Sequence, residues 1–363
     1  MARLFLHIGA HKTATSYLQA LFHHNRQELA AAGLHYPVIG PNNAHHALAA
    51  SWLDMIDLPP GFFGSEGPDG LWERAILRPY ATRPGTVFLS AENFSRFDPQ
   101  RVDMAALARR LAVFEEVRIV YTLRGQAEML ASLWVQIARS RKAPTLRRYL
   151  ERAFATGMGG GVMLDHHAVY QHLRSGFRPE QIILLDYDEI RRRPGGVAQA
   201  FLDLMGVPLR AETLTPPPAE THNVSPDALS LWLACQICRD GPPPEDLIAL
   251  TGTVLHGAAP RPTTLLSQSE YDKLRAKFRR DNARLGALVA PWQPGFRFDP
   301  PPPPETLLYR DQIPPHVWPD IAAALWAKSE PPGLPGLLRR AARKLIVSHG
   351  TASGREVVKT PRS

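Results

Sequence analysis

The stretch LFLHIGAHKTATSYLQALF, residues 4–22, decides the fold of this chain of 363 residues. Its apolar start, Leu4–Ile8, is short and ends at Gly9, a pattern typical of a buried β-strand. From Thr15 to Ala32, apolar residues recur on one face at helical spacing. The stretch therefore predicts a strand, a short polar loop and a helix, with the loop at a helix N-terminus, where anions bind well.

The polar loop differs from the Walker pattern Gly-x-x-x-x-Gly-Lys-Ser/Thr, the common loop for nucleotide triphosphates. Only Ala10 and His11 separate Gly9 from Lys12, and the second glycine is missing. The physics of anion binding is retained, because backbone N–H groups converge at the helix start and Lys12 adds a positive charge. Further hydroxyl donors follow from Thr13, Thr15 and Ser16. We therefore expect the loop to hold a phosphate, with a spacing that argues against ATP.

The first 206 residues alternate apolar runs with helical patterns. Further strands are predicted at Thr86–Ser90, Val117–Leu123 and Gln181–Leu185, with helices between them. This alternation predicts an α/β fold, a doubly wound, mostly parallel sheet flanked by helices, of the P-loop NTPase-like type. Ligands of such sheets bind beyond the carboxyl ends of the strands. The polar residues directly after these strands are therefore the candidates for a site.

The organisation changes after Gly206, where prolines become frequent. Residues 1–290 are predicted to form the α/β domain, with residues 206–290 as its helical part. A Pro-rich helical extension is predicted at 291–333, in which the polyproline run at 300–304 is an extended spacer. A basic amphipathic helix and tail at 334–363 is expected to make at most weak contact with an anionic membrane surface.

The overall charge favours an anionic ligand. The formal net charge is +8 and the sequence pI is about 9.7. No aromatic-interleaved basic stripe accompanies this charge, which argues against nucleic acid as the main partner. The two cysteines are too few for a zinc site, and we expect no metal. The absence of a leader pattern or a membrane-spanning run predicts a cytoplasmic location.

Residues His7–Gln19, HIGAHKTATSYLQ, resemble the first motif of the sulfotransferase family that uses 3′-phosphoadenosine-5′-phosphosulfate (PAPS). In that family a later strand ends in an arginine that binds the 3′-phosphate together with a serine eight residues on. The segment VRIVYTLRGQAEMLASLW supplies Arg124 and Ser132 at this spacing. The resemblance covers roughly residues 3–288, and its later part is similar to the bacterial carbohydrate-directed branch. It implies that the 5′-phosphosulfate is held by His11, Lys12, Thr13, Ala14, Thr15 and Ser16, although the family usually has glycine at position 14.

Transfer of a sulfonyl group requires a base for the acceptor hydroxyl and positive charge on the departing phosphate. Lys12 is placed to supply that charge. Glu92, in FLSAENFSRF, is the candidate base, because the family uses His or Glu near this point. A carboxylate in a partly dry cleft is expected to have a raised pKa. His11, His45 and His46 compete with it: His11 is near enough to touch the sulfonate, and the other two are candidates to line the acceptor site.

Two other functions stay open. The apolar run IILLDYD ends at Asp186 and imitates a Walker-B site for Mg²⁺, as in a P-loop kinase or NTPase. A non-catalytic anion-binding protein with the same fold would fit Ala14 and the basic tail. The acceptor of a sulfotransferase would meet the variable segments Pro37–Pro84 and Arg139–Gly161. Their aromatic and basic residues suit a glycan or glycolipid.

Overall fold

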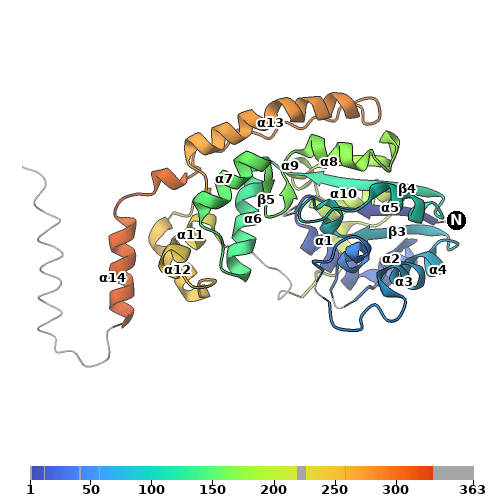
Figure 1. Ribbon diagram of the computed structural model, residues 1–363, viewed down its shortest axis with the longest axis horizontal. Helices are drawn as coiled ribbons and strands as arrows, with labels where there is room; N and C mark the ends of the chain where they lie inside the picture. The colour runs from blue at the N-terminus through green and yellow to red at the C-terminus, as the bar shows by residue number, and fades with distance from the viewer. Residues whose placement is uncertain are drawn as a thin grey trace, which may run out of the picture.

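The computed structural model describes residues 2–11, 13–40, 42–56, 58–218, 226–257 and 259–329. At its centre is a five-stranded sheet in the order β2-β3-β1-β4-β7, in which all neighbouring strands run parallel. The predicted α/β class, with a mostly parallel sheet flanked by helices, is confirmed (Figure 1). The strands are β1 (Ala2–His7), β2 (Leu34–His35), β3 (Gly85–Ser90), β4 (Glu116–Leu123) and β7 (Ile182–Asp186).

Strand β1 lies in the middle of the sheet because both of its faces are apolar. Leu4 and Leu6 belong to the core on one face, and Phe5 belongs to the core on the other. β1 pairs with β3 on one side and with β4 on the other. The strand order therefore reverses at β1, and ligands of open α/β sheets bind at the carboxyl end of such a switch point.

Helices pack on both faces of the sheet (Figure 1). The smaller core, around Phe5 and Phe88, is closed by α1 (Thr15–His24), α2 (Arg26–Ala31) and α10 (Gly196–Met205). The larger core, around Leu4 and Tyr121, includes residues of α5 (Met104–Leu111), α6 (Gln126–Ser140), α7 (Leu146–Thr156), α8 (His166–Leu173), α11 (Ala228–Ile237), α12 (Glu245–His256), α13 (Gln268–Val289) and α14 (Val317–Ser329).

The remaining elements are short. They are α3 (Gly67–Trp72), α4 (Arg78–Tyr80), α9 (Tyr187–Ile190), the π-helix η2 (Glu73–Leu77), the hairpin strands β5 (Met158–Gly159) and β6 (Val162–Met163), and the 3-10 helices η1 (His46–Ser51), η3 (Glu92–Ser95), η4 (Pro179–Gln181), η5 (Ala211–Thr213) and η7 (Arg310–Gln312). Two of them, η1 and η3, lie against each other and carry residues of the candidate site.

The single helix expected over residues 15–32 is interrupted at Asn25, which separates α1 from α2. The Asn25 side chain is buried and donates to the carbonyls of Leu21 and Thr215, both at 2.8 Å. Its oxygen accepts from the Thr215 amide at 2.9 Å. The break is therefore a tertiary anchor between α1 and a distant segment, which helical periodicity does not reveal.

The second half of the chain differs from the prediction in several places. The glycine run after α7 forms the turn of the β5–β6 hairpin. Helix α13 starts with a Ser267–Glu270 capping box, and both capping hydrogen bonds form. The Pro-rich run packs back on the protein, since Arg275 donates to the carbonyl of Pro300 at 2.9 Å. α12 and α14 were not predicted as separate helices.

The basic helix and tail expected at 334–363 lie outside the described residues, and the predicted domain limits at 290 and 333 stay predictions. In the described part of the chain, no helix combines the length and the apolar character needed to cross a lipid bilayer.

Candidate active site

The candidate site is built at the carboxyl ends of β1, β3 and β4. After β1 the chain keeps pairing with β4, because the amides of Ile8 and Ala10 donate to the carbonyls of Val120 and Thr122, both at 2.9 Å. On the other side, the Ala91 amide donates to the His7 carbonyl at 2.9 Å. The start of the loop is therefore fixed between the two strand ends that carry the other predicted site residues.

The loop after β1 turns directly into α1. The first helical hydrogen bond runs from the Leu18 amide to the Ala14 carbonyl at 3.1 Å, so the preceding amides make no bond within the helix. Ala14, at the N-cap, has a φ of 57°, the left-handed region that favours glycine. Gly9 is needed for another reason: a Cβ there would lie 2.7 Å from the His7 ring and 3.1 Å from Thr15. Lys12 lies outside the described residues.

The hydroxyl groups of the loop point in different directions. Thr13 is buried and donates to the Ala10 carbonyl at 2.8 Å, closing the loop on itself. Thr15 is buried and donates to the Glu92 carboxylate. Ser16 is exposed in the first turn of α1. Two of the three hydroxyls predicted to face an anion therefore hold the loop in shape instead, and Ser16 is the exposed one.

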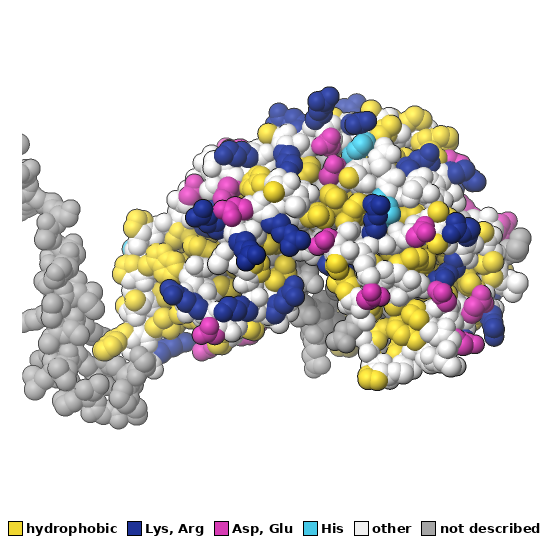
Figure 2. Space-filling model, in the orientation of Figure 1, with side chains coloured by type: hydrophobic (Ala, Val, Ile, Leu, Met, Phe, Trp, Pro, Cys, Tyr) yellow, Lys and Arg dark blue, Asp and Glu magenta, His cyan; other side chains and the backbone are white. Residues whose placement is uncertain are grey.

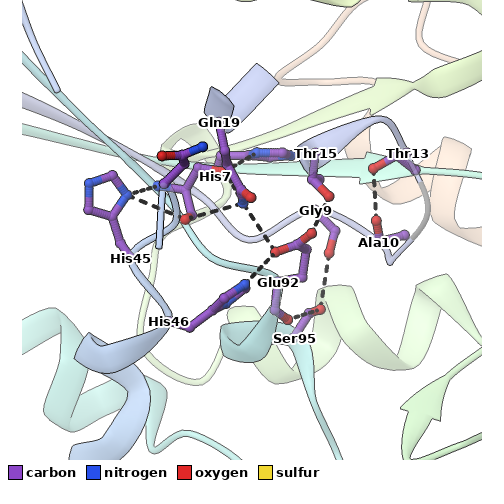
Figure 3. Close-up of polar contacts among 12 residues, drawn as sticks. His7, Gly9, Ala10, Thr13, Thr15, Gln19, His45, His46, Glu92 and Ser95 are labelled. Atoms are coloured by element: carbon purple, nitrogen blue, oxygen red, sulfur yellow. Dashed lines mark hydrogen bonds and ion pairs between the residues drawn. The ribbon is translucent and has the colours of Figure 1, made fainter. Parts of the chain in front are cut away.

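Glu92, at the start of η3, lies at the centre of a buried polar network (Figure 3). Its Oε1 accepts from the Thr15 hydroxyl, and its Oε2 accepts from Gln19 Nε2 at 3.2 Å. His46 Nε2 lies 3.4 Å from Oε2. The Ser95 hydroxyl bridges the carbonyls of Glu92, at 2.8 Å, and Gly9, at 3.1 Å. The carboxylate is thus held between the loop after β1 and the short helix after β3.

The pKa of Glu92 is lowered, contrary to the expectation that a dry cleft would raise it. Burial alone would raise this pKa, but the positive charges of His46 and His11 and the hydrogen bond from Thr15 outweigh burial. The resulting pKa is about 2. Glu92 is therefore ionised at all ordinary pH values, because its neighbours stabilise the charged form more than burial disfavours it.

His45 and His46 are adjacent in sequence but have different surroundings. His45 is fully buried: its Nδ1 accepts from the Ser90 amide at 2.9 Å, and its Nε2 donates to the Pro37 carbonyl at 2.8 Å. Burial lowers the pKa of His45 to about 4. The His46 side chain is 31% exposed, and its Nδ1 has no hydrogen-bond partner among the described residues. Of the pair, only His46 contacts Glu92.

His7, on β1, was not singled out in the sequence, although it holds three strand ends together. Its Nδ1 lies 3.0 Å from the Ser90 hydroxyl, and its Nε2 lies 3.2 Å from the Thr122 hydroxyl. Burial lowers its pKa to about 4, although the charge of Glu92 opposes this shift. Gln19 extends the network by donating to the Ser90 hydroxyl at 3.1 Å. These contacts join residues of β1, β3, β4 and α1.

Arg124 and Ser132, which the family resemblance implies to act together, contact each other. Arg124 Nη1 donates to the Ser132 hydroxyl at 3.1 Å, and the guanidinium stacks over the Tyr187 ring at 5.7 Å. Both residues line a small cavity of about 150 Å³. Burial lowers the pKa of Arg124, and the negative charges around it oppose that shift. Glu128 also lines the cavity, but its carboxylate accepts from the Tyr271 hydroxyl at 2.6 Å.

His166 supports Arg124 from behind. Its Nε2 donates to the Arg124 carbonyl at 2.8 Å, and its Nδ1 accepts from the Tyr121 hydroxyl at 2.8 Å. The ring is fully buried, and burial lowers its pKa to about 4. These contacts give His166 a structural role. Its partner Arg124, 42 residues away, was not foreseeable from the sequence.

The segment that imitates a Walker-B site has another use. Asp186, at the end of β7, accepts from the amides of Asp188, at 2.8 Å, and Glu189, at 3.4 Å. It therefore caps the N-terminus of α9. Within residues 2–11, 13–40, 42–56, 58–218, 226–257 and 259–329, no group of three or more His, Cys, Asp or Glu side chains is arranged to hold a metal ion.

The chain is similar to several solved structures. A sulfotransferase from Alicyclobacillus acidocaldarius is 18% identical, with a TM-score of 0.42, and the match covers 80% of this chain and 98% of that one. A mouse sulfotransferase, SULT7A1, complexed with PAP is 12% identical, with a TM-score of 0.39 and coverage of 80% and 88%. A sulfotransferase domain from the curacin biosynthetic pathway is 11% identical, with a TM-score of 0.35 and coverage of 77% and 97%.

A search among curated proteins finds no match. The family model described as "Sulfotransferase domain" matches residues 5–219, which is more than half of the chain. The matched range includes the loop after β1, Glu92 and the Arg124–Ser132 pair. The chain therefore belongs to the sulfotransferase family of sulfonyl-transferring enzymes.

Proposed function

We propose that this protein transfers a sulfonyl group from PAPS to a hydroxyl group of an acceptor. The observation that carries the proposal is the continuation of β1 along β4, down to the Ala10–Thr122 hydrogen bond of 2.9 Å. It brings an anion-type loop next to the strand end that bears Arg124 and Ser132. A donor with a phosphate group at each end of its nucleoside would suit two such sites on neighbouring strands.

The residues around Arg124 fit a terminal phosphate. The donor set is one permanently charged guanidinium and one hydroxyl, which together suit the oxygens of a phosphate dianion. In the loop, we propose that the backbone amides after Gly9, together with Ser16, hold the 5′-phosphosulfate. Lys12 is proposed to neutralise the charge that develops on the phosphate. When bound, PAPS supplies a sulfonyl group attached to a phosphate leaving group.

We propose that Glu92 accepts the proton of the acceptor hydroxyl. An ionised carboxylate offers about four lone-pair positions, and three side chains contact this one: Thr15 at Oε1, and Gln19 and His46 at Oε2. We propose that the acceptor hydroxyl approaches Oε1, which has a single side-chain partner. A carboxylate with a low pKa is a weak base, but the acceptor hydroxyl becomes strongly acidic as its oxygen bonds to sulfur. Proton transfer to Glu92 late in the reaction is thus favourable.

His46 is proposed to face the acceptor. Its partly exposed ring contacts Glu92 through Nε2, and its buried Nδ1 has no hydrogen-bond partner among the described residues. His11, whose charge acts on Glu92, is proposed to lie near the transferred group. The two ring nitrogens of His45 already bind backbone groups, so we propose that it shapes the acceptor site by anchoring the segment before η1. The acceptor is proposed to be a glycan or glycolipid.

The first experiment compares ligands by thermal shift. Adenosine 3′,5′-bisphosphate (PAP), the product of the donor, should stabilise the protein by about 2.7 kcal/mol at a concentration 100-fold above its dissociation constant. ATP with Mg²⁺ is the matched control and should produce a smaller shift, since it lacks the 3′-phosphate. A larger shift with ATP and Mg²⁺ than with PAP would overturn the proposal and favour a kinase or NTPase. Transfer of labelled sulfate to a glycan fraction then separates an enzyme from a binding protein.

A further inference from the structure

A basic pocket is lined in part by the chain that follows the proposed reaction centre. It has a volume of about 530 Å³ and is lined by the chain after η3, the loop between α6 and α7, helix α7 and the β5–β6 hairpin. Met55, which follows η1, closes it on another side. Because η1 begins with His46 and η3 begins with Glu92, the chain on both sides of the reaction centre continues into this pocket.

The lining of the pocket contains more positively charged side chains than carboxylates. Its cationic side chains are Arg96, Arg141, Lys142, Arg148 and Arg152, against Asp98 as the single carboxylate. The Asp98 carboxylate forms an ion pair with Arg152 at 3.2 Å. Lys142 lies 3.6 Å from the fully exposed Asp240. Within the described residues, the guanidinium groups of Arg141 and Arg148 have no carboxylate partner.

Arg96 is built into the pocket wall. Its Nη2 donates to the Gly160 carbonyl at 2.8 Å, and its Nε is buried without a hydrogen-bond partner among the described residues. Burial lowers the pKa of this guanidinium; Asp98 opposes the shift and the charge of Arg141 adds to it. Gly161 has a φ of 85°, and a Cβ there would lie 2.5 Å from Arg96 Nη2 and 2.4 Å from the Asp98 carbonyl. The hairpin turn therefore leaves room for the Arg96 side chain only because residue 161 is glycine.

Like charges held together in a partly apolar pocket repel one another. Ile137, Met55 and Tyr149 contribute apolar surface to the lining, which weakens solvent screening. A bound oxyanion would relieve the repulsion and would satisfy the buried Nε of Arg96. Figure 2 shows that Lys and Arg side chains gather over the part of the molecule where Figure 1 places α6, α7 and α11. The basic pocket is thus part of a face that attracts anions.

We infer that the basic pocket binds an acidic group of the acceptor, so that the preferred acceptor is a saccharide that already carries a sulfate or carboxylate near the reacting hydroxyl. This inference rests on the proposed function, because it assigns the acceptor side of the same site. Arg96 would contact the anion at the pocket wall, and Arg141 and Arg148 would contact it at the rim.

The test is direct binding of a saccharide probe without any donor. A chondroitin sulfate hexasaccharide should bind the full chain, and the same hexasaccharide should bind at least tenfold more weakly after desulfation and carboxyl reduction. The double substitution Arg141→Ala with Arg148→Ala should weaken binding of the sulfated probe at least tenfold, because each charged hydrogen bond contributes enough for about that factor. Arg109→Ala, an exposed arginine of α5 outside the pocket, is the matched control and should have no effect.

The outcomes separate this inference from the proposed function. Equal binding of the sulfated and neutral probes, or equal loss in the Arg109→Ala control, would overturn the acidic-saccharide site. Binding to phosphatidylglycerol vesicles that depends on Arg141 and Arg148, without saccharide binding, would also overturn it, because the anion would then belong to a lipid. The PAP thermal shift is measured on every variant and should be unchanged. If PAP fails to stabilise the unsubstituted protein, the donor assignment fails while the saccharide result still stands.

Discussion

The two ends of the proposed donor site are built differently. At the ends of β1 and β3, the polar side chains of Thr13, Thr15 and Glu92 hydrogen-bond to the protein itself. At the end of β4, the Arg124 and Ser132 side chains line the cavity. We call the first region, with Thr13, Thr15 and Glu92, the frame. We call the second region, with Arg124 and Ser132, the clasp. Substitutions in the frame should alter turnover and stability, whereas substitutions in the clasp should alter ligand affinity.

The largest effect is expected from Glu92→Gln in the frame. Removal of the proposed base should lower kcat by about 10²- to 10⁴-fold. The KM for PAPS should change little, because Glu92 faces Thr15, Gln19 and His46 instead of the Arg124 clasp. The measurement is initial rates of labelled sulfate transfer. Glu180→Gln, a partly exposed carboxylate within η4, is the control and should keep full activity. Normal turnover in Glu92→Gln would remove the base assignment.

Acid should destabilise the frame more than the clasp. The pKa values of His7, His45 and His166 are about 4 in the folded protein, because burial disfavours the charged form, and 6.5 when the ring is not perturbed. The unfolded chain therefore binds more protons between these values, so the stability is fully present above pH 6.5 and falls as the pH drops towards 4. Each histidine contributes about 3 kcal/mol over this window. Glu92 changes the unfolding free energy only below about pH 4.5, because its pKa is 4.5 when unperturbed and about 2 in the folded protein.

Urea unfolding at several pH values between 7 and 4.5 measures this dependence. His45→Gln should flatten the pH slope of the unfolding free energy, because glutamine can also accept from the Ser90 amide and donate to the Pro37 carbonyl without titrating. His166→Gln is the corresponding substitution in the clasp. The clasp contains one of the three buried histidines and the frame contains two, so the frame should account for more of the pH dependence. A stability independent of pH over this range would contradict the buried neutral state of these rings.

In the clasp, Arg124→Ala should weaken PAP binding by about 100-fold, since two charge-assisted hydrogen bonds to a phosphate are lost. Ser132→Ala should cost about fivefold, the value of one neutral hydrogen bond near 1 kcal/mol. Arg124→Lys keeps the charge but not the forked geometry and should fall between the two. Calorimetric titration with PAP measures these affinities. An unchanged affinity in Arg124→Ala would show that the 3′-phosphate binds elsewhere.

The smallest expected effect comes from Ala14→Gly in the frame. A non-glycine residue in the left-handed region is strained, and the glycine would relieve this at some cost in unfolded-state entropy. The net gain in unfolding free energy should be about 1 kcal/mol or less. Ala10→Gly, a buried alanine of the same loop, is the control and should destabilise the protein. If Ala14→Gly also lowers stability, the strained conformation is not a cost to the fold.

Much of the fold was predictable because its signals are local. The strand limits of β3 and β4, and the limits of α10, agree with the sequence patterns within a residue or two. Helix α1 starts where the pattern places it, but its end depends on Asn25 and Thr215, which are far apart in sequence. The anion loop and the pair at positions 124 and 132 were also visible, because each motif lies within one strand–helix unit.

The sequence alone determined the α/β class and the anion loop after the first strand, since periodicity and short spacings specify such features, and the family resemblance implied the pairing of Arg124 with Ser132. The tertiary structure decided the protonation of Glu92, the inward direction of Thr15 and the support of Arg124 by His166. It also decided the assembly of the basic pocket from the chain after η3, helix α7 and the β5–β6 hairpin. These properties depend on contacts between residues 42 or 77 positions apart, and on burial, neither of which a local pattern encodes.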